Sequence, residues 1–558
     1  MKNSALKQRV DYILINGNVI TVDNENNCVE AIAVGGNTIL ATGSNEYVLK
    51  LKTEDTKIID CENKTVIPGI IDSHTHLWEY GILSQGVITF GIKSIDELKK
   101  KVAEAISELQ KGEWLQGGSW IETQFVENRM PTRWDLDEVS PDNPVVIERI
   151  FGACVVNSAA LKLANINKET PDPLDGTIER DENMEPTGVL QGQAVLLVRE
   201  VLPGAFGSDD FGSGKGTSKS EEYERYIKLG MPDYVKYGIT SIVEPGVSPV
   251  ICKAYQDIRN KGELNLRVNL MPNWHGFTLN QQVEKMDRYI KEVGIYSGFG
   301  DEWLRFGGLK MAIDGGLTSK TAILSWPYLN ESEPREGRRR LDLSRLDEWI
   351  KAAHDAGWSI GIHVMGDIAI EMSVNAIYKA YKANPIKRNH HIIHAYYPTE
   401  DSLAKMKEAG IMASVQGSFT YGEADGYDDL LTKEKQEEFL PLKTYNESGI
   451  ITSLSSDTPC AHVNPFLGLY SAITRKGMQG YCLGAKECIS VLDGIRMLTL
   501  NGAYITNEQE IKGSLEPGKL ADICILDRNI LECDVEEIKD IEVKLSMLDG
   551  KVIYNNMQ

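Results

Sequence analysis

The sequence predicts an α/β protein, a TIM (β/α)8 barrel with two additions, and three features of the chain lead to this fold class. Both ends alternate like β-strands, the middle repeats a strand-then-helix pattern, and a long segment separates the first repeat from the second. We expect a composite β-sandwich domain from residues 1–66 and 508–558, a barrel domain over 67–507, and an α+β insertion over 82–235 within the barrel domain.

The two ends of the chain share one pattern of alternating hydrophobic and polar residues. Hydrophobic and polar residues alternate in YILINGNVITVD and AIAVGGNTILATG near the start, where Asn-Gly and Gly-Gly mark turns typical of antiparallel strands. The same alternation returns near the end in LADICILDRN and VKLSMLDG. The simplest interpretation is one small β-domain built from both ends, with a larger domain inserted between them.

The middle of the chain contains eight candidate strands, over residues 65–76, 238–246, 266–274, 306–314, 358–366, 390–397, 410–417 and 449–457. Amphipathic helical segments separate several of them, and LDEWIKAAHDAG and DSLAKMKEAG each end at a glycine, as a helix C-cap would. Eight strand–helix units predict a TIM barrel. The stretch between the first two strands is too long for one loop, which predicts the insertion.

Composition and charge favour a cytoplasmic protein that acts on a small molecule. The 558 residues are too many for one compact core, and 42% hydrophobic with 25% charged residues is the balance of an ordinary globular protein. No apolar stretch approaches the ~18 residues of a membrane span, and we expect no signal peptide. A formal charge of −22 repels nucleic-acid phosphate and anionic lipid. Nine cysteines without CxxC spacing indicate reduced thiols.

Histidines gather where the candidate strands end. The first strand ends in His74 and His76, and since strand side chains alternate, residues two apart point the same way. Parallel α/β enzymes place their chemistry at the carboxyl ends of strands. Other strands contribute four more polar residues: Lys310 in the fourth, His363 in the fifth, His394 in the sixth and Asp457 at the end of the eighth. Convergence of all six on one rim predicts a metal centre.

The ligand types indicate the metal chemistry. Neutral imidazole and carboxylate suit Zn²⁺, Mn²⁺ or Fe²⁺, with zinc the first expectation. Four histidines and an aspartate exceed what one tetrahedral Zn²⁺ binds with a position open for water, so two metals sharing a hydroxide would accommodate them. Lys310 fits as a bridging ligand if its desolvated amine captures CO₂ and becomes N6-carboxylysine.

These residues also carry a resemblance to a known family. Their order, together with VIPGIIDSHTH, GEWLQGGSW, MPTRWDLDEVSPDNPV, KMAIDGGLTSKTA, HVMGD, SSDTPC, NPFLGL and GSLEPGKLADICIL, resembles the amidohydrolase superfamily of metal-dependent hydrolases. Within it, the chain looks like the amidohydrolase 3 branch, which contains N-substituted formamide deformylases. The resemblance covers nearly the whole chain.

The resemblance implies a barrel, a composite β-sandwich and hydrolysis by a metal-bound hydroxide. His74 and His76 would hold the more buried metal with Asp457, while His363 and His394 would hold a second. Lys310 would bridge the two metals, or remain unmodified beside a single one. The catalytic residues would be Asp457, as the proton shuttle, with Lys310 and His363. A homodimer is expected by analogy.

Four positions depart from the polar residues common in that branch: Val243, Ile393, Ala153 and Ile121. Because polar positions have become apolar or small while the six metal-ligand candidates remain, we expect a change in substrate recognition, toward a less polar or differently charged substrate. Further candidates for substrate binding lie at strand ends and in the insertion: Trp274, His275, Gln416, Trp120, Glu122 and Glu244.

The sequence leaves three functions open. The first is hydrolysis of a C–N bond in an amide, cyclic amide, urea or formamide. The second keeps the hydroxide but changes the bond, to that of an ester or lactone, a ring to be deaminated, or the C–C bond of a cyclic 1,3-diketone opened by a cyclohydrolase. The third is a non-catalytic scaffold, which retention of all six ligand candidates disfavours.

Overall fold

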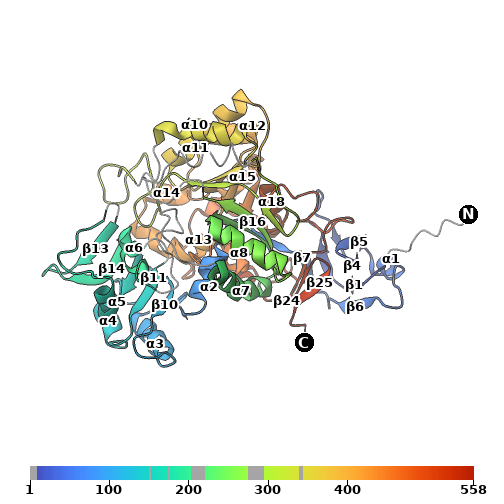
Figure 1. The fold of residues 1–558 in the computed structure, drawn as a ribbon. Helices are drawn as coiled ribbons and strands as arrows, with labels where there is room; N and C mark the ends of the chain where they lie inside the picture. Colours follow the sequence, from blue (N-terminus) through green and yellow to red (C-terminus); the bar gives the residue numbers. More distant parts are fainter. Residues whose placement is uncertain are drawn as a thin grey trace, which may run out of the picture.

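The computed structural model describes residues 9–149, 153–173, 176–202, 220–273, 294–337 and 343–557. It confirms the α/β class, because parallel strands at the centre are surrounded by helices (Figure 1). Among the described residues, none of the helices combines the length and the apolar character that crossing a bilayer requires.

The central strands form two parallel sheets, and each sheet follows the order of the chain. The first holds β8 (Ile70–Asp72), β15 (Ile239–Val247), β16 (Arg267–Pro272) and β17 (Leu304–Phe306). The second holds β18 (Leu309–Ala312), β19 (Ile360–Val364), β20 (His391–His394), β21 (Met412–Val415) and β22 (Thr452–Leu454). Every neighbouring pair runs parallel.

The candidate strand over 306–314 is divided between the two sheets. β17 pairs with β16 and β18 pairs with β19, so the chain passes from one sheet to the other at Gly307 and Gly308. A Cβ on Gly307 would lie 3.0 Å from Asn269, closer than ordinary packing allows, which explains a glycine at this crossing. A parallel bridge between Asn273 and Lys310 still connects the sheets.

Helices connect the parallel strands and pack on their outer side. They are α7 (Ser220–Lys236), α8 (Pro249–Asn260), α10 (Leu346–Asp355), α11 (Asp367–Ala383), α12 (Glu400–Ala409), α13 (Gly417–Glu423), α14 (Lys433–Glu437), α15 (Leu442–Glu447), α16 (Pro465–Thr474), α17 (Val491–Leu498) and α18 (Leu500–Ile505). In α10 the buried residues Leu346, Trp349, Ile350 and Ala353 follow the spacing of one helical face. As expected, α12 ends at Gly410, whose φ of 71° is left-handed.

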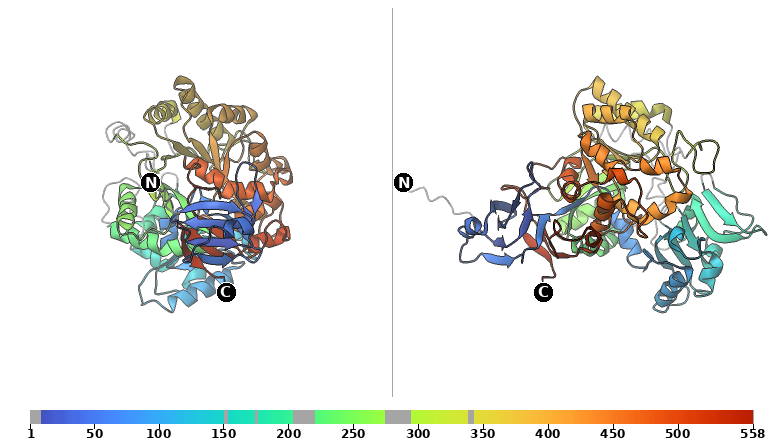
Figure 2. Two further views of the ribbon diagram at one scale, coloured as in Figure 1. Left: turned by 90° about the vertical axis from the view of Figure 1, so that its right-hand side faces the viewer. Right: turned by 180° about the vertical axis from the view of Figure 1, so that it is seen from behind.

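The two ends of the chain share one six-stranded sheet. Its order is β25 (Lys551–Asn555), β24 (Val543–Leu548), β23 (Ile523–Leu526), β7 (Thr65–Pro68), β2 (Asn18–Ile20) and β3 (Cys28–Val29). A second sheet contains β5 (Thr38–Gly43), β4 (Ala31–Gly35), β1 (Tyr12–Ile15) and β6 (Lys57–Asp60). The pairings of β1 with β6 and of β2 with β7 are parallel, unlike the antiparallel pattern expected from the alternation. These strands lie together on one side of the molecule (Figures 1 and 2).

The segment after the first central strand begins with α2 (Leu77–Leu83) and then builds a sheet of its own. That sheet holds β9 (Val87–Ile88), β10 (Leu115–Trp120), β11 (Val145–Arg149), β12 (Ala153–Val156), β13 (Gly176–Arg180) and β14 (Pro186–Gly192), with α3 (Ile95–Ile106), α4 (Arg133–Asp137), α5 (Ser158–Leu163) and α6 (Ala194–Arg199) against it. It lies opposite the terminal strands (Figure 2). It contacts α13, where Gln124 Nε2 donates to Gly422 O at 3.1 Å, and the loop after β22, where Ser119 Oγ donates to Pro459 O at 3.2 Å.

Candidate active site

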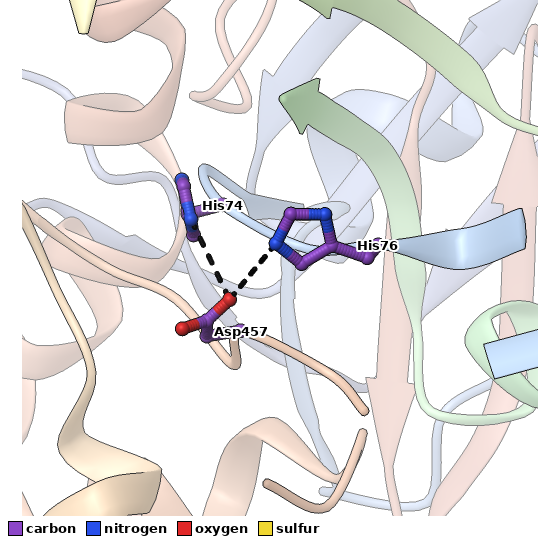
Figure 3. Close-up of side chains that lie close together, drawn as sticks. All are labelled: His74, His76 and Asp457. Atoms are coloured by element: carbon purple, nitrogen blue, oxygen red, sulfur yellow. Dashed lines mark ion pairs between the residues drawn. The ribbon is translucent and has the colours of Figure 1, made fainter. Parts of the chain in front are cut away.

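Two loops bring His74, His76 and Asp457 together, one after β8 and one after β22. The backbone nitrogen of His76 donates to Thr458 O at 2.7 Å, and that of Asp457 donates to His74 O at 2.8 Å. The Asp457 carboxylate oxygen Oδ1 lies 3.5 Å from His74 Nε2 and 3.2 Å from His76 Nε2 (Figure 3). One ligand atom from each residue fits within 4.8 Å of the others, a spacing that could hold a metal ion.

The two histidines converge for a reason other than strand alternation. β8 ends at Asp72, so His74 and His76 both lie beyond it, and His76 occupies the N-cap position of α2. The Asp72 carboxylate accepts from the backbone nitrogen of Ser456 at 3.0 Å and from its hydroxyl at 2.6 Å. Hydrogen bonds between the two loops therefore place the imidazoles.

Lys310 lies beside the same cluster. Its Nζ is 3.4 Å from His74 Nε2, and its side chain is almost fully buried. Burial, with a further contribution from the Lys310 charge, holds the pKa of His74 well below its ordinary value, so the imidazole is neutral, as a metal ligand must be. The buried Nδ1 of His74 has no hydrogen-bond partner among the described residues.

His363 and His394 extend the row of imidazoles. Their ring centroids are 4.4 Å apart, and the His394 centroid is 5.8 Å from that of His74. His363 Nε2 donates to Gly315 O at 3.2 Å, which leaves Nδ1 as the acceptor nitrogen. The four histidines and Asp457 thus lie next to one another, with Lys310 in contact.

Gln416 orients His394. Its carbonyl oxygen Oε1 lies 2.5 Å from His394 Nδ1, so Nδ1 carries the proton and Nε2 keeps its lone pair. The amide nitrogen of Gln416 donates to Ser455 Oγ at 2.9 Å. Gln416, a candidate for substrate binding, is fully buried and hydrogen-bonded to protein at both amide atoms.

Acidic residues surround His76. Burial acts to lower the pKa of His76, but the carboxylates of Glu79, Asp457 and Glu244 outweigh burial and raise it to about 9. Burial raises the pKa of Glu244 to about 8. Glu244 is fully buried and accepts from Leu77 N at 3.0 Å and from the Tyr255 hydroxyl at 2.7 Å, so it lies behind His76.

The donor set fits a divalent metal. It combines a carboxylate with four imidazoles, and hydrogen bonds define the acceptor nitrogen of His363 and of His394. Burial lowers the pKa of His394 to about 4. A positively charged ion there would also balance Asp457 and the acidic residues near His76.

The remaining candidates for substrate binding lie in the inserted segment or outside the described residues. Trp120 is buried in the inserted segment, where its indole nitrogen donates to Ile147 O at 3.2 Å. Glu122 accepts two hydrogen bonds from Arg149, at 2.7 and 2.8 Å. Trp274 and His275 lie outside the described residues.

The four apolar departures are all buried: Ile121, Ala153, Val243 and Ile393. Ile393 pairs in register with His363 across parallel strands, so the two share a face of the sheet. An apolar side chain therefore stands beside a metal-ligand candidate, while the effect on substrate choice remains a prediction.

Two residues around this site, Asp314 and Glu79, were not among the sequence-based candidates. Asp314 is fully buried and accepts from the backbone nitrogens of Met365 at 3.0 Å, Gly366 at 2.8 Å and Ile323 at 3.1 Å, which fixes the loops around His363. The sequence does contain a pattern that indicates this role for Asp314, since an aspartate directly after an apolar strand often accepts hydrogen bonds from nearby backbone nitrogens. Glu79, in the first turn of α2, had no comparable pattern around it.

Comparison with known proteins agrees with this geometry. The model of the Amidohydrolase family matches residues 57–554. The chain belongs to the amidohydrolase family. It is 29% identical over 551 residues to the putative amidohydrolase YtcJ of Bacillus subtilis, covering 96% of this chain and 98% of that protein. It is 27% identical to N-substituted formamide deformylase of Arthrobacter pascens, covering 98% and 99%.

Solved structures show the same fold. An uncharacterised metal-dependent hydrolase from Pyrococcus horikoshii superposes with a TM-score of 0.72 at 24% identity, over 94% of this chain and 99% of that one. Another, from Pyrococcus furiosus, gives 0.70 at 25% identity, over 93% and 100%. This member of the amidohydrolase family is therefore a hydrolytic enzyme, and its His and Asp cluster is a candidate site for a divalent metal.

Proposed function

We propose that this amidohydrolase cleaves the C–N bond of a small amide, cyclic amide, urea or formamide, with zinc as its metal. The observation that carries the proposal is the joining of His74, His76 and Asp457 within reach of one ion, with Lys310 and the His363–His394 pair adjacent. The similarity to a formamide deformylase supports a C–N bond as the target.

The roles of the residues follow from their positions. A divalent metal bound here would lower the pKa of water and polarise the substrate carbonyl. His74 and His76 would hold it with Asp457, and His363 and His394 would hold a second ion if two are bound. Asp457 Oδ1, which faces both imidazoles of the first pair, would take a proton from the attacking water and deliver it to the leaving nitrogen.

Lys310 would contribute as N6-carboxylysine. Its buried amine lies 3.4 Å from His74 Nε2, within the cluster of metal-ligand candidates, and a carbamate would reverse its charge. As an anion it would attract the metals that the ammonium form repels.

A second function is hydrolysis of another bond, in a lactone, a ring to be deaminated or a cyclic 1,3-diketone. Ile393, on the same face as His363, favours it because an apolar wall suits a substrate with few polar groups.

We also propose that the two parallel sheets close into one TIM barrel, that residues 1–66 and 508–558 form the composite β-sandwich domain, and that 82–235 is an insertion in the barrel domain 67–507. The shared terminal sheet and the separate sheet β9–β14 support this division. We further propose that the protein is cytoplasmic, forms a homodimer and binds neither nucleic acid nor membrane. Light scattering of the purified protein tests the homodimer.

The test is a mass-shift screen with the metal-loaded enzyme. The panel sets amides, formamides and cyclic ureas against lactones and cyclic 1,3-diketones. Cleavage of the C–N compounds supports the first function, whereas turnover confined to the other compounds would replace it with the second.

A further inference from the structure

Three polar atoms on segments that contact His394 are buried without a hydrogen-bond partner among the described residues. They are the Tyr396 hydroxyl, Thr420 Oγ1 and Glu423 Oε1, on side chains of residues 1%, 0% and 3% exposed. Such groups are uncommon in folded proteins because each forfeits its hydrogen bonds to water on burial. Three in one neighbourhood indicate a place where another molecule supplies the partners.

All three atoms belong to elements that also position His394. Tyr396 follows His394 by two residues, and their ring centroids are 6.2 Å apart. α13 begins directly after Gln416, and its Phe419 ring stacks on His394 at 5.8 Å. Thr420 and Glu423 are three residues apart on α13, so they share one helical face.

Glu423 has one oxygen bonded to protein and one oxygen without a partner. Oε2 accepts from the Tyr427 hydroxyl at 2.8 Å, and the Thr318 hydroxyl also acts on this carboxyl as a hydrogen-bond donor that lowers its pKa, while Oε1 has no partner in good hydrogen-bonding geometry. Burial raises the pKa of this carboxyl to about 7. The ion pair of Arg149 with Glu122 lies near enough to affect the same carboxyl, so the inserted segment forms one side of its surroundings.

Tyr396 connects Glu423 to the metal-ligand cluster. The Tyr396 ring packs on Phe439 with centroids 4.5 Å apart, and Phe439 packs on Tyr427 at 5.1 Å. The Tyr427 hydroxyl in turn donates to Glu423. Tyr396 therefore lies between His394 and the side chains that surround Glu423.

We propose that Tyr396, Thr420 and Glu423 form a recognition subsite for an amino group carried by the substrate away from its scissile bond. A carboxylate oxygen accepts hydrogen bonds and attracts positive charge, and the two hydroxyls can accept from the same nitrogen. The subsite deepens the proposed function and rests on it for the identity of the scissile bond. The enzyme then selects amino-substituted amides over their unsubstituted analogues.

The test compares two pairs of probes on the zinc-loaded enzyme. N-benzylformamide and its 4-aminomethyl derivative report turnover. N-benzylmethanesulfonamide and its 4-aminomethyl derivative resist hydrolysis and report binding by calorimetry. We expect the amino group to improve both kcat/KM and Kd at least tenfold, and Glu423→Gln to reduce that preference to within threefold. Thr420→Val, a change of similar size, should also weaken it if Glu423→Gln does not fold.

The control is Glu487→Gln, since the Glu487 carboxylate is also buried but accepts from Thr444 N and Oγ1, at 2.9 and 2.8 Å, in contact with α15. It should keep the preference for the amino group. Equal binding of both sulfonamides by the unmodified enzyme, or binding of neither, overturns the subsite. Selective binding without hydrolysis of either formamide keeps the subsite and rejects the C–N function, so the two failures are distinct.

Discussion

Asp457 is joined to His74 twice: its backbone nitrogen donates to His74 O at 2.8 Å, and its carboxylate lies 3.5 Å from His74 Nε2. The loops after the first and the last central strand, β8 and β22, thus meet at the candidate metal site. The φ of Asp457 is 55°, a left-handed conformation that aspartate and asparagine tolerate better than most residues. The left-handed turn at Asp457 therefore positions both its backbone nitrogen and its carboxylate against His74.

This turn makes Asp457→Asn a clean test of the carboxylate. Asparagine keeps the left-handed backbone and the size of the side chain but cannot take a proton from water. We expect kcat to fall by about 10²–10⁴ with the melting temperature near that of the parent. Steady-state kinetics and circular dichroism check this; a variant with a tenth or more of the parent activity would remove Asp457 from the proton-transfer role.

Gln416 should act through His394. Gln416→Leu removes the acceptor for His394 Nδ1–H, and we expect metal affinity to weaken about 10–100-fold. Competition with a chelator measures the affinity. Ser455→Ala, which removes one acceptor of the Gln416 amide nitrogen and leaves the Gln416 carbonyl oxygen on His394, is the matched variant and should have a smaller effect. Unchanged affinity in Gln416→Leu would contradict the orienting role.

Metal binding should strengthen as pH rises toward about 9. Glu79 and its acidic neighbours raise the pKa of His76 to about 9 in the metal-free protein, so at neutral pH a metal must displace a proton from His76. Below the pKa the proton competes, so affinity should increase about tenfold per pH unit between pH 7 and 9. Calorimetry in buffers of different ionisation enthalpy counts the released proton.

Glu79→Gln provides the control for that effect. Removing this carboxylate lowers the pKa of His76, so at pH 7 less proton is released and the pH dependence becomes shallower. An identical pH dependence in the two proteins would show that another group controls metal binding.

The carboxylysine hypothesis has its own signature. Lys310→Ala should lose metal and most activity, and short carboxylic acids such as acetate should restore part of both by occupying the place of the carbamate. Metal analysis and kinetics with added acetate measure the rescue. A high-resolution map of the active enzyme with a bare Lys310 amine would reject the modification.

A buried ion pair connects the parallel strands to the terminal sheet. Arg267 on β16 is fully buried and donates to the Asp522 carboxylate at 2.7 and 3.0 Å and to Asp549 at 3.2 Å. Arg267→Ala should lower the free energy of unfolding by about 3–5 kcal/mol because the buried Asp522 carboxylate and the partly buried Asp549 carboxylate lose their partner. Chemical denaturation measures it. Lys50→Ala, at the exposed pair with Glu46, should have no measurable effect.

The sequence predicted more of this site than of its surroundings. The ligand candidates at the strand ends were accessible because polar residues after apolar strands form a local pattern. The way in which His74 and His76 converge could not be predicted, because it depends on hydrogen bonds to the loop of Asp457, almost four hundred residues away in the chain. Glu423 and Tyr396 gave no local signal either, because a buried unpartnered oxygen is defined only by what packs around it.

The most direct test of this account is an anomalous diffraction map of zinc-loaded crystals, measured at the zinc absorption edge. The account predicts a peak about 2.0–2.2 Å from His74, His76 and Asp457 ligand atoms, with any second peak at His363 and His394. A catalytically active, zinc-loaded protein whose anomalous peaks lie away from these residues would contradict it.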